Sequence, residues 1–171
     1  MWFFTGKGDQ GSTRLIDGQE LPKSDIVFEL IGSLDEATAC IGLSISFCDD
    51  PDVKGDLAEI QDLLSKFMGV IAGAGETVIA NRFNLSDAIE WIEQRITHYG
   101  HELSNPQAFI YSGKTSLGAA IDITRTVIRR CERIAVRFNK THPDFSNTSL
   151  VFLNRLSSFF FILRLYVDEE I

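Results

Sequence analysis

Apolar residues recur at steps of three and four along almost the whole chain after residue 23, and this helical period constrains the fold more than any other feature. Pro51, a glycine cluster at 73–75 and turn-forming residues at 103–116 and 141–144 interrupt the period. It therefore predicts five helices, over residues 24–48, 53–74, 86–102, 115–139 and 147–168, with Ser86 as the N-cap of the third. Such helices with short connections favour an all-α, five-helix up-down bundle.

The first 23 residues are different, because glycines and Pro22 leave only brief apolar runs there. They are predicted to form a Gly-rich loop with at most one short strand. A chain of 171 residues with 44% hydrophobic content suffices for one continuous core, and it shows no internal repeat or linker. We predict a single domain over 1–171, with the N-terminal loop at 1–23 and the helical bundle at 24–171.

The charge balance argues against one class of partner. Sixteen Lys and Arg against 24 Asp and Glu give a net charge of −8, which disfavours sequence-independent binding of nucleic acid. No export signal and no membrane span is evident, so a cytoplasmic protein is expected. Cys40, Cys48 and Cys131 are expected to be free, buried thiols.

The last predicted helix is apolar almost all round, since it contains the run Phe159, Phe160, Phe161. A helix without a polar face must be buried on more than one side. Because it is short and interrupted by Arg155 and Arg164, it is not expected to span a bilayer. Burial against neighbouring subunits is favoured over a central position within one bundle.

Three glycines fall within six residues in the segment Thr5-Gly6-Lys7-Gly8-Asp9-Gln10-Gly11-Ser12-Thr13-Arg14. Glycines let several backbone N–H groups turn toward one anion, and Lys7, Thr13 and Arg14 add charge and a hydroxyl. The spacing is not that of a Walker A loop. We interpret the segment as a phosphate-binding loop, with a mobile N-terminal arm as the alternative.

The fourth predicted helix carries five arginines on the face opposite its apolar stripe: Arg125, Arg129, Arg130, Arg133 and Arg137. Only Asp122 and Glu132 accompany them, whereas a solvated face normally interleaves acids. Arginine suits bidentate contacts to phosphate or carboxylate, so an anion-binding or interface role is favoured over a solvated face. Asp35 follows Leu34 on an apolar register of the first helix and would need a cationic partner, for which this arginine face is the candidate.

In their order and spacing these segments resemble the PduO-type ATP:corrinoid adenosyltransferases, over nearly the whole chain from Thr5 to about Arg164. The shared motifs are the glycine segment at 5–13, Lys23, a Gly-x-x-Asp-Glu stretch at 32–36, the arginine run at 125–133 and Asn-Arg-Leu-Ser at 154–157. The resemblance implies a cobalamin adenosyltransferase-like, ferritin-like bundle that forms a homotrimer with active sites between adjacent subunits.

The same resemblance implies roles for particular residues. ATP is expected to contact Thr5, Gly6, Lys7, Gly8, Thr13, Arg14, Lys23, Arg129, Arg130, Glu132, Arg133 and Asn154, although a hydrogen-bonded core asparagine is the alternative for Asn154. Arg129 is also expected to be catalytic, together with a salt bridge between Asp35 and Arg125 near the corrinoid. Phe109 is expected to displace the lower axial base of the corrinoid and leave cobalt four-coordinate, whereas a core position is the alternative.

The residues fit a reaction in which the 5′-deoxyadenosyl group of ATP moves to a cob(I)alamin co-substrate. A Co(I) corrinoid is itself a strong nucleophile, so the chain needs no nucleophile of its own and its task is positioning. Mg²⁺ is expected to arrive on the phosphates of ATP. No protein metal site is predicted, because His98, His101 and His142 lack metal-ligand spacing.

The chain departs from the family pattern mainly on the corrinoid side. Ser112-Gly113-Lys114 stands where many members have Pro-Gly-Gly, and Asp122 stands where a His is frequent. A non-catalytic ATP- or corrinoid-binding regulator and a plain helical interaction module are the alternative functions. For the enzyme, possible partners are a reductase and an adenosylcobalamin-dependent enzyme.

Overall fold

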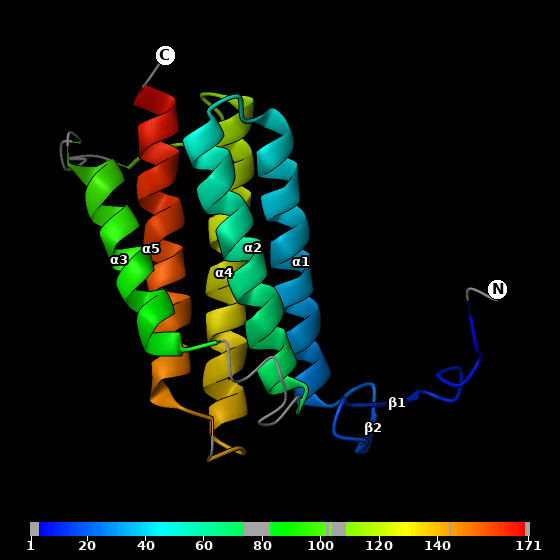
Figure 1. The fold of residues 1–171 in the computed structure, drawn as a ribbon. Coiled ribbons are helices and arrows are strands. Elements are labelled where there is room, and N and C mark those ends of the chain that lie inside the picture. The colour runs from blue at the N-terminus through cyan, green and yellow to red at the C-terminus, as the bar shows by residue number, and fades with distance from the viewer. Residues whose placement is uncertain (1–3, 74–82, 102, 104–108, 144, 170–171) are drawn as a thin grey trace.

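The computed structural model describes residues 4–73, 83–101, 103, 109–143 and 145–169, and it confirms the predicted five-helix bundle (Figure 1). The helices are α1 (Ile26–Phe47), α2 (Pro51–Ile71), α3 (Leu85–Gly100), α4 (Ser116–Asn139) and α5 (Asn147–Glu169). The expectation of at most one N-terminal strand is wrong, because β1 (Ser12–Arg14) and β2 (Glu20–Pro22) pair as an antiparallel hairpin.

Each of the five helices begins at a side chain that accepts a hydrogen bond from the backbone of the first turn. These side chains are Asp25, Asp50, Asn84, Thr115 and Ser146. The prediction that Ser86 caps the third helix is wrong. The backbone N–H of Ser86 donates to Asn84 Oδ1 at 2.9 Å, because Asn84 already turns the chain into α3.

The helices pack as a row of α1, α4 and α5, with α3 against α5 and α2 against α1 (Figure 1). One hydrophobic cluster draws residues from all five helices. A hydrogen-bonded group adds a polar link between α2 and α3, since Tyr99 Oη and Arg95 Nε both donate to Asp56 Oδ2 at 2.6 Å. Burial, and then the bond to Asp56, raise the pKa of Tyr99 well above its usual range, so the phenol remains a donor.

Much of α5 is buried within a single chain, as the alternative of a central position predicts, and burial of the remainder against neighbouring subunits stays a prediction. Phe152, Leu156, Phe159, Phe160 and Leu163 are completely covered by the rest of the bundle. With 23 residues the helix is long and apolar enough to cross a membrane, so the expectation that it is too short is also wrong. Because 56% of its most apolar stretch is buried inside the bundle, it is the core helix of this fold.

The cysteines are free thiols, as predicted, although their burial differs. Cys48 and Cys131 are buried, whereas Cys40 is only half-buried. Burial raises the pKa of Cys131 to about 12, so this thiol stays protonated at neutral pH.

The N-terminal hairpin leaves the foot of α1 and extends away from the bundle (Figure 1). Thr13 pairs with Leu21 across the two strands, and Ile16 N donates to the Ala72 carbonyl at 3.0 Å. Gly6 and Gly11 have φ values of +69° and +81°, a left-handed conformation that favours glycine. The path of this arm therefore depends on two of the three glycines noted in the sequence.

The close approach of α4 and α5 at Gly118 gives a stability prediction. A Cβ at this position would overlap the carboxylate of Asp168. We expect Gly118→Ala to lower the free energy of unfolding by about 1–3 kcal/mol, the usual cost of overpacking.

Gly55→Ala is the matched control, because a Cβ there meets nothing within 4 Å. The higher helix propensity of Ala should make that control more stable by roughly 0.5–1 kcal/mol. Urea unfolding measures both changes, and a neutral Gly118→Ala would refute the close packing.

Candidate active site

A cavity of about 590 Å³ beside α4 and α5 contains the predicted corrinoid residue. Its lining comprises Phe109, Ile110, Tyr111, Ser112, Asp122, Arg125, Phe161 and Arg164. The Phe109 and Tyr111 rings are each 81% exposed, and they meet edge to face with centroids 5.1 Å apart. Phe109 is therefore not a core residue, and its ring is accessible to a ligand.

The segment that follows Phe109 is anchored on the last turns of α5. Arg164 donates to the Tyr111 carbonyl, and Lys114 Nζ donates to the Asp168 carbonyl. Thr115 Oγ1 donates to Asp168 Oδ1 at 2.8 Å. The Arg164 side chain is only 2% exposed, and its Nε lies 3.4 Å from Asp168 Oδ2. A buried arginine without that carboxylate would be strongly destabilising, so the anchor is part of the packed structure.

The same segment is also anchored on α4, through Asp122. Asp122 Oδ1 accepts from Arg125 Nε at 2.7 Å, and Oδ2 accepts from Ser112 Oγ. Burial favours a higher pKa for Asp122, but the hydrogen bonds from Arg125 and Ser112, with the charges of Arg125 and Arg164, outweigh it and hold the pKa below its usual range. Asp122 is therefore a carboxylate at neutral pH.

The lowered pKa of Asp122 predicts a pH dependence of stability. Because the pKa is lower in the folded than in the unfolded chain, the stabilisation is fully present above the unfolded value of about 3.9 and is lost as the pH falls through the folded value. We expect the difference in unfolding free energy between the wild type and Asp122→Asn to be present at about pH 7 and to shrink below about pH 4. Urea unfolding across this range tests it, and a constant difference would contradict the assignment.

A second cavity, of about 600 Å³, lies on the N-terminal arm. Its lining comprises Thr5, Lys7, Gly8, Ser12, Thr13, Arg14 and Glu20. Lys23 joins this group, because a Cβ on Gly8 would lie 3.0 Å from Lys23 Nζ. Glu20 accepts from Ser12 Oγ at 2.9 Å and from Arg14 Nη2 at 3.1 Å, and these contacts lower the pKa of Glu20. Most of the residues predicted to bind phosphate thus lie together on the arm.

Two of the α4 arginines are neutralised by α1. Arg130 pairs with Glu36, and Arg137 Nη2 lies 2.6 Å from Glu29 Oε1. The expected partner, Asp35, is exposed and makes no ion pair among the described residues. The prediction of Asp35 as the acid that meets the arginine face is therefore wrong within one chain, because the helical register turns Glu29 and Glu36 toward α4 instead.

Arg129 and Arg133 remain without an ion pair in the part of the chain that the structure describes. Both are exposed, and Arg133 Nη1 donates to the Arg129 carbonyl at 3.1 Å. Next to them, Asn154 Nδ2 donates to Glu132 Oε1 at 3.2 Å and links α5 to α4. Asn154 Oδ1 accepts from Arg155, so this half-buried amide is hydrogen-bonded on both sides. The structure thus brings Glu132 and Asn154 together beside two unpaired arginines.

The predicted bridge between Asp35 and Arg125 does not form within one chain, where Arg125 binds Asp122. The ion pairs align Glu36 with Arg130 and Glu29 with Arg137 in the antiparallel packing of α1 and α4. In this register Asp35 lies level with Cys131. That position is about 9 Å along α4 from Arg125, at 1.5 Å per residue. The bridge stays a prediction for a contact between two copies.

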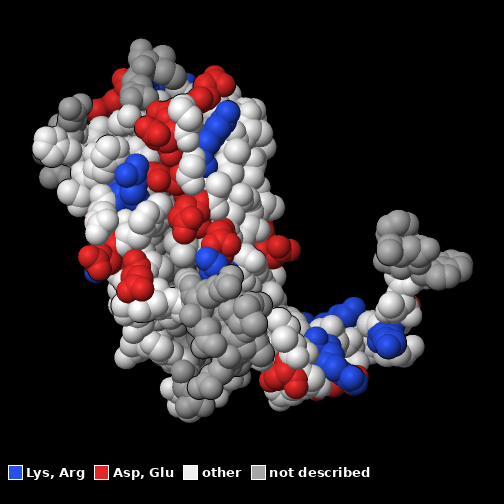
Figure 2. Space-filling model, viewed as in Figure 1, with Lys and Arg blue, Asp and Glu red and all other residues white. Residues whose placement is uncertain are grey.

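The arm and the bundle carry opposite charge in one view of the molecule. Figure 2 shows Lys and Arg gathered on the arm, whereas Asp and Glu predominate on the bundle face beside it. Among the described residues, no hydrogen bond or ion pair joins the arm to Arg129 or Arg133. The same residues contain no group of three or more His, Cys, Asp or Glu that could hold a metal ion.

The family model described as cobalamin adenosyltransferase matches residues 3–167. The chain belongs to this family. The corrinoid adenosyltransferase of Bacillus subtilis is 31% identical over 99% of this chain and 88% of its own length. The cobalamin adenosyltransferase of Cupriavidus metallidurans is also 31% identical, over 93% and 84%. A solved variant of the PduO-type ATP:corrinoid adenosyltransferase from Lactobacillus reuteri, complexed with cobalamin and ATP, matches with a TM-score of 0.87 at 28% identity, over 98% of this chain and 94% of that one. The PduO-type resemblance is confirmed.

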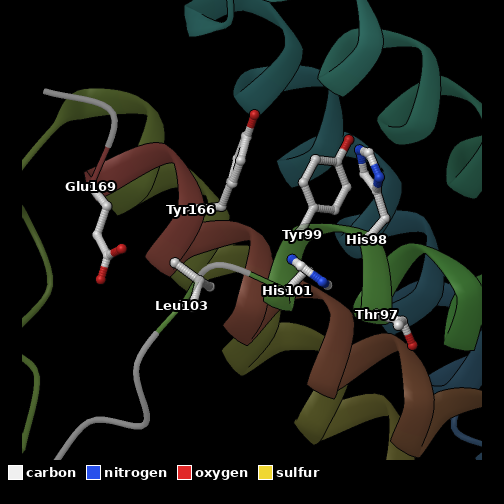
Figure 3. Close-up of a pocket in the computed structure, with 7 residues that line it drawn as sticks. All are labelled: Thr97, His98, Tyr99, His101, Leu103, Tyr166 and Glu169. Carbon is white, nitrogen blue, oxygen red and sulfur yellow. The ribbon is translucent and has the colours of Figure 1, made fainter.

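A third cavity in this cobalamin adenosyltransferase, of about 660 Å³, contains none of the predicted site residues. It lies between the ends of α3 and α5 and is lined by Thr97, His98, Tyr99, His101, Leu103, Tyr166 and Glu169 (Figure 3). In the close-up, His98 and Glu169 lie on opposite sides of the cavity and do not converge on one point. Cavity volume alone therefore does not distinguish this cavity from the two that contain predicted site residues.

Sequence reasoning missed several residues that anchor the segment after Phe109. Ser112 and Asp122 were noted as separate departures, but their contact was not expected. Asp122 and Arg125 are three residues apart in a helix, a spacing typical of an ion pair, and this signal could have revealed their contact. No local pattern indicates that Arg164 reaches the Tyr111 carbonyl.

Proposed function

We propose that this family member transfers the 5′-deoxyadenosyl group of ATP to the cobalt of cob(I)alamin and releases adenosylcobalamin and triphosphate. The observation that carries the proposal is the pair Arg129 and Arg133, exposed and without an ion pair among the described residues of a chain with net charge −8. Two guanidinium groups one turn apart, neither of them in an ion pair with a described residue, favour a polyanionic ligand. Triphosphate, the leaving group of this reaction, is such a ligand.

The chain's own residues orient the substrates and stabilise charge. Co(I) is the nucleophile at the ribose C5′, and triphosphate leaves with the electron pair of the broken C5′–O bond. In this proposal Arg129 neutralises the charge that develops on the leaving group, since no acid among the described residues pairs with it. The arm is proposed to surround the phosphates with Thr5, Gly6, Lys7, Gly8, Thr13, Arg14 and Lys23, and Mg²⁺ to arrive bound to them. Arg130, Glu132, Arg133 and Asn154 form the other wall.

We propose that the site is shared between subunits of a homotrimer. The arm projects away from its own bundle (Figure 1). In the α1–α4 register of one chain, Asp35 lies about 9 Å along α4 from Arg125, at 1.5 Å per residue. The same register places Leu43 level with Ile123, and these apolar side chains are 44% and 50% exposed. Both observations favour a second copy of the chain against α1 and α4.

The trimer is directly testable by mass. Light scattering of the purified protein should report three times the 19.1 kDa chain mass. Replacing Leu43 with Asp should dissociate the assembly and abolish turnover, because a desolvated carboxylate at the contact is costly. A stable, active monomer would remove the shared-site proposal.

The proposed setting of the enzyme is the cytoplasm. Co(I) is strongly reducing, so a reductase is expected to supply it close to the site. The product is expected to pass to an adenosylcobalamin-dependent enzyme. These partners follow from the reaction chemistry.

A spectrophotometric assay tests the proposed function. Chemically reduced cob(I)alamin is mixed with protein, and ATP is then added. Loss of the Co(I) absorbance with formation of adenosylcobalamin supports the enzyme. ATP binding without turnover would instead identify a non-catalytic regulator. No effect of ATP on either absorbance or thermal stability would identify a plain interaction module.

A further inference from the structure

We infer that Asp122 is a positioning residue that holds both the loop bearing Phe109 and Tyr111 and the side chain of Arg125. A single buried carboxylate accepts from Ser112 Oγ on the loop and from Arg125 Nε on α4. The loop and the helix therefore meet at one charged group. Its role toward a corrinoid rests on the proposed function, whereas the contacts do not.

On the loop side, the bond fixes the backbone next to two open rings. Ser112 directly follows Tyr111, and Phe109 and Tyr111 are in edge-to-face contact while both remain largely in solvent. Packing of an exposed aromatic ring against apolar neighbours lowers the free energy of the protein. Anchoring at Ser112, with the bond from Arg164 to the Tyr111 carbonyl, opposes that collapse and keeps the rings presented beside the cavity.

On the helix side, the bond fixes the direction of Arg125. Asp122 uses only Nε of the guanidinium, and the two terminal nitrogens make no hydrogen bond to other described residues. Arg125 lines the same cavity as the two rings, so these donors remain available there. The charged groups around Asp122 are Arg125 on its own helix and Arg164 on α5, and with the hydrogen bond from Ser112 they hold its pKa below the usual range.

Ser112 and Asp122 are also two of the positions where this chain departs from the family pattern. A proline at 112 would have no side-chain donor for Asp122. The two departures are in direct contact, so they act as a unit in this chain.

The test compares Ser112→Ala, Asp122→Asn, Asp122→Ala and the Ser112→Ala/Asp122→Ala double variant. Asp122→Ala should raise the KM for corrinoid about tenfold while the KM for ATP stays within about twofold, since a charge-assisted bond that orders the loop is lost. Ser112→Ala should raise the KM for corrinoid about threefold. The corrinoid KM of Asp122→Asn should lie between those of Ser112→Ala and Asp122→Ala, because an acceptor oxygen remains. The double variant should equal Asp122→Ala, because the shared contact is already gone.

A second readout needs no ligand. Chymotrypsin cleavage after Phe109 and Tyr111 should quicken severalfold in Ser112→Ala and Asp122→Ala. Asp56→Ala is the matched control, because it breaks the Asp56, Arg95 and Tyr99 group and should lower Tm without changing the corrinoid KM or this cleavage.

An unchanged corrinoid KM with unchanged cleavage, or additive effects in the double variant, would overturn the role of Asp122. If the wild type shows no turnover, the proposed function fails, and the cleavage rates still decide whether Asp122 holds the loop.

Discussion

Arg129→Ala should lower kcat/KM for adenosyl transfer by about 30- to 1000-fold, or roughly 2–4 kcal/mol of transition-state stabilisation. The expected loss is large because no acid among the described residues occupies this guanidinium, so its full charge is available to the leaving triphosphate. Steady-state kinetics with pre-reduced cob(I)alamin measure the change. The loss should appear mainly in kcat, since the charge on the leaving group develops in the transition state.

Arg137→Ala is the control on the same helix. Its partner is Glu29 at 2.6 Å, and both side chains are about half exposed. Such surface pairs contribute at most about 1 kcal/mol to stability. Turnover should stay within about twofold of the wild type. Wild-type turnover in Arg129→Ala, or an equal loss in both variants, would remove Arg129 from the site.

Phe109→Ala should separate two assays. When the reaction starts from Co(II) and a mild reductant, most activity should disappear, because Phe109 is proposed to displace the lower axial base. An axial ligand stabilises the higher oxidation state of cobalt. Removing that ligand therefore lets a mild reductant reduce Co(II) to Co(I). When Co(I) is made chemically beforehand, much more activity should remain. Stopped-flow absorbance follows both reactions.

The stability of Phe109→Ala provides the control. The ring is 81% exposed, so Tm should change little. Phe160→Ala removes a fully buried ring and should cost about 3–5 kcal/mol. Equal activity losses in both assays, together with a large fall in the Tm of Phe109→Ala, would mean that Phe109 stabilises the fold and that the corrinoid lies elsewhere.

The helices could be predicted from the sequence because their apolar period is long and is interrupted by strong breakers such as Pro51. The hairpin could not, since strands of three residues carry too little alternation to stand out from a Gly-rich loop. The environment of α5 could be predicted only in part. An all-round apolar helix must be buried, but its composition does not say whether its own bundle or a neighbour covers it.

The site shows a similar division. The arginines of α4 lie on one helix, so their spacing alone predicts that they share a surface. Which acid pairs with which arginine depends on the rotation of α1 about its own axis against α4. A rotation by one residue position decides whether Asp35 or Glu36 faces the arginines. The contact between Ser112 and Asp122 spans a loop-to-helix transition, where no period relates the two residues.

The anchoring of the Phe109 segment on Asp168 makes the end of α5 part of the machinery that presents the ring. Asp168 holds Lys114 and Thr115, and it also balances Arg164, which holds the Tyr111 carbonyl. A truncation or bulky fusion that unwinds this last turn should therefore impair corrinoid reduction while leaving every residue that touches substrate intact. For protein engineering, the last turn of α5 is therefore expected to matter for function, although Asp168 lies just beyond the residues 3–167 that the family model matches.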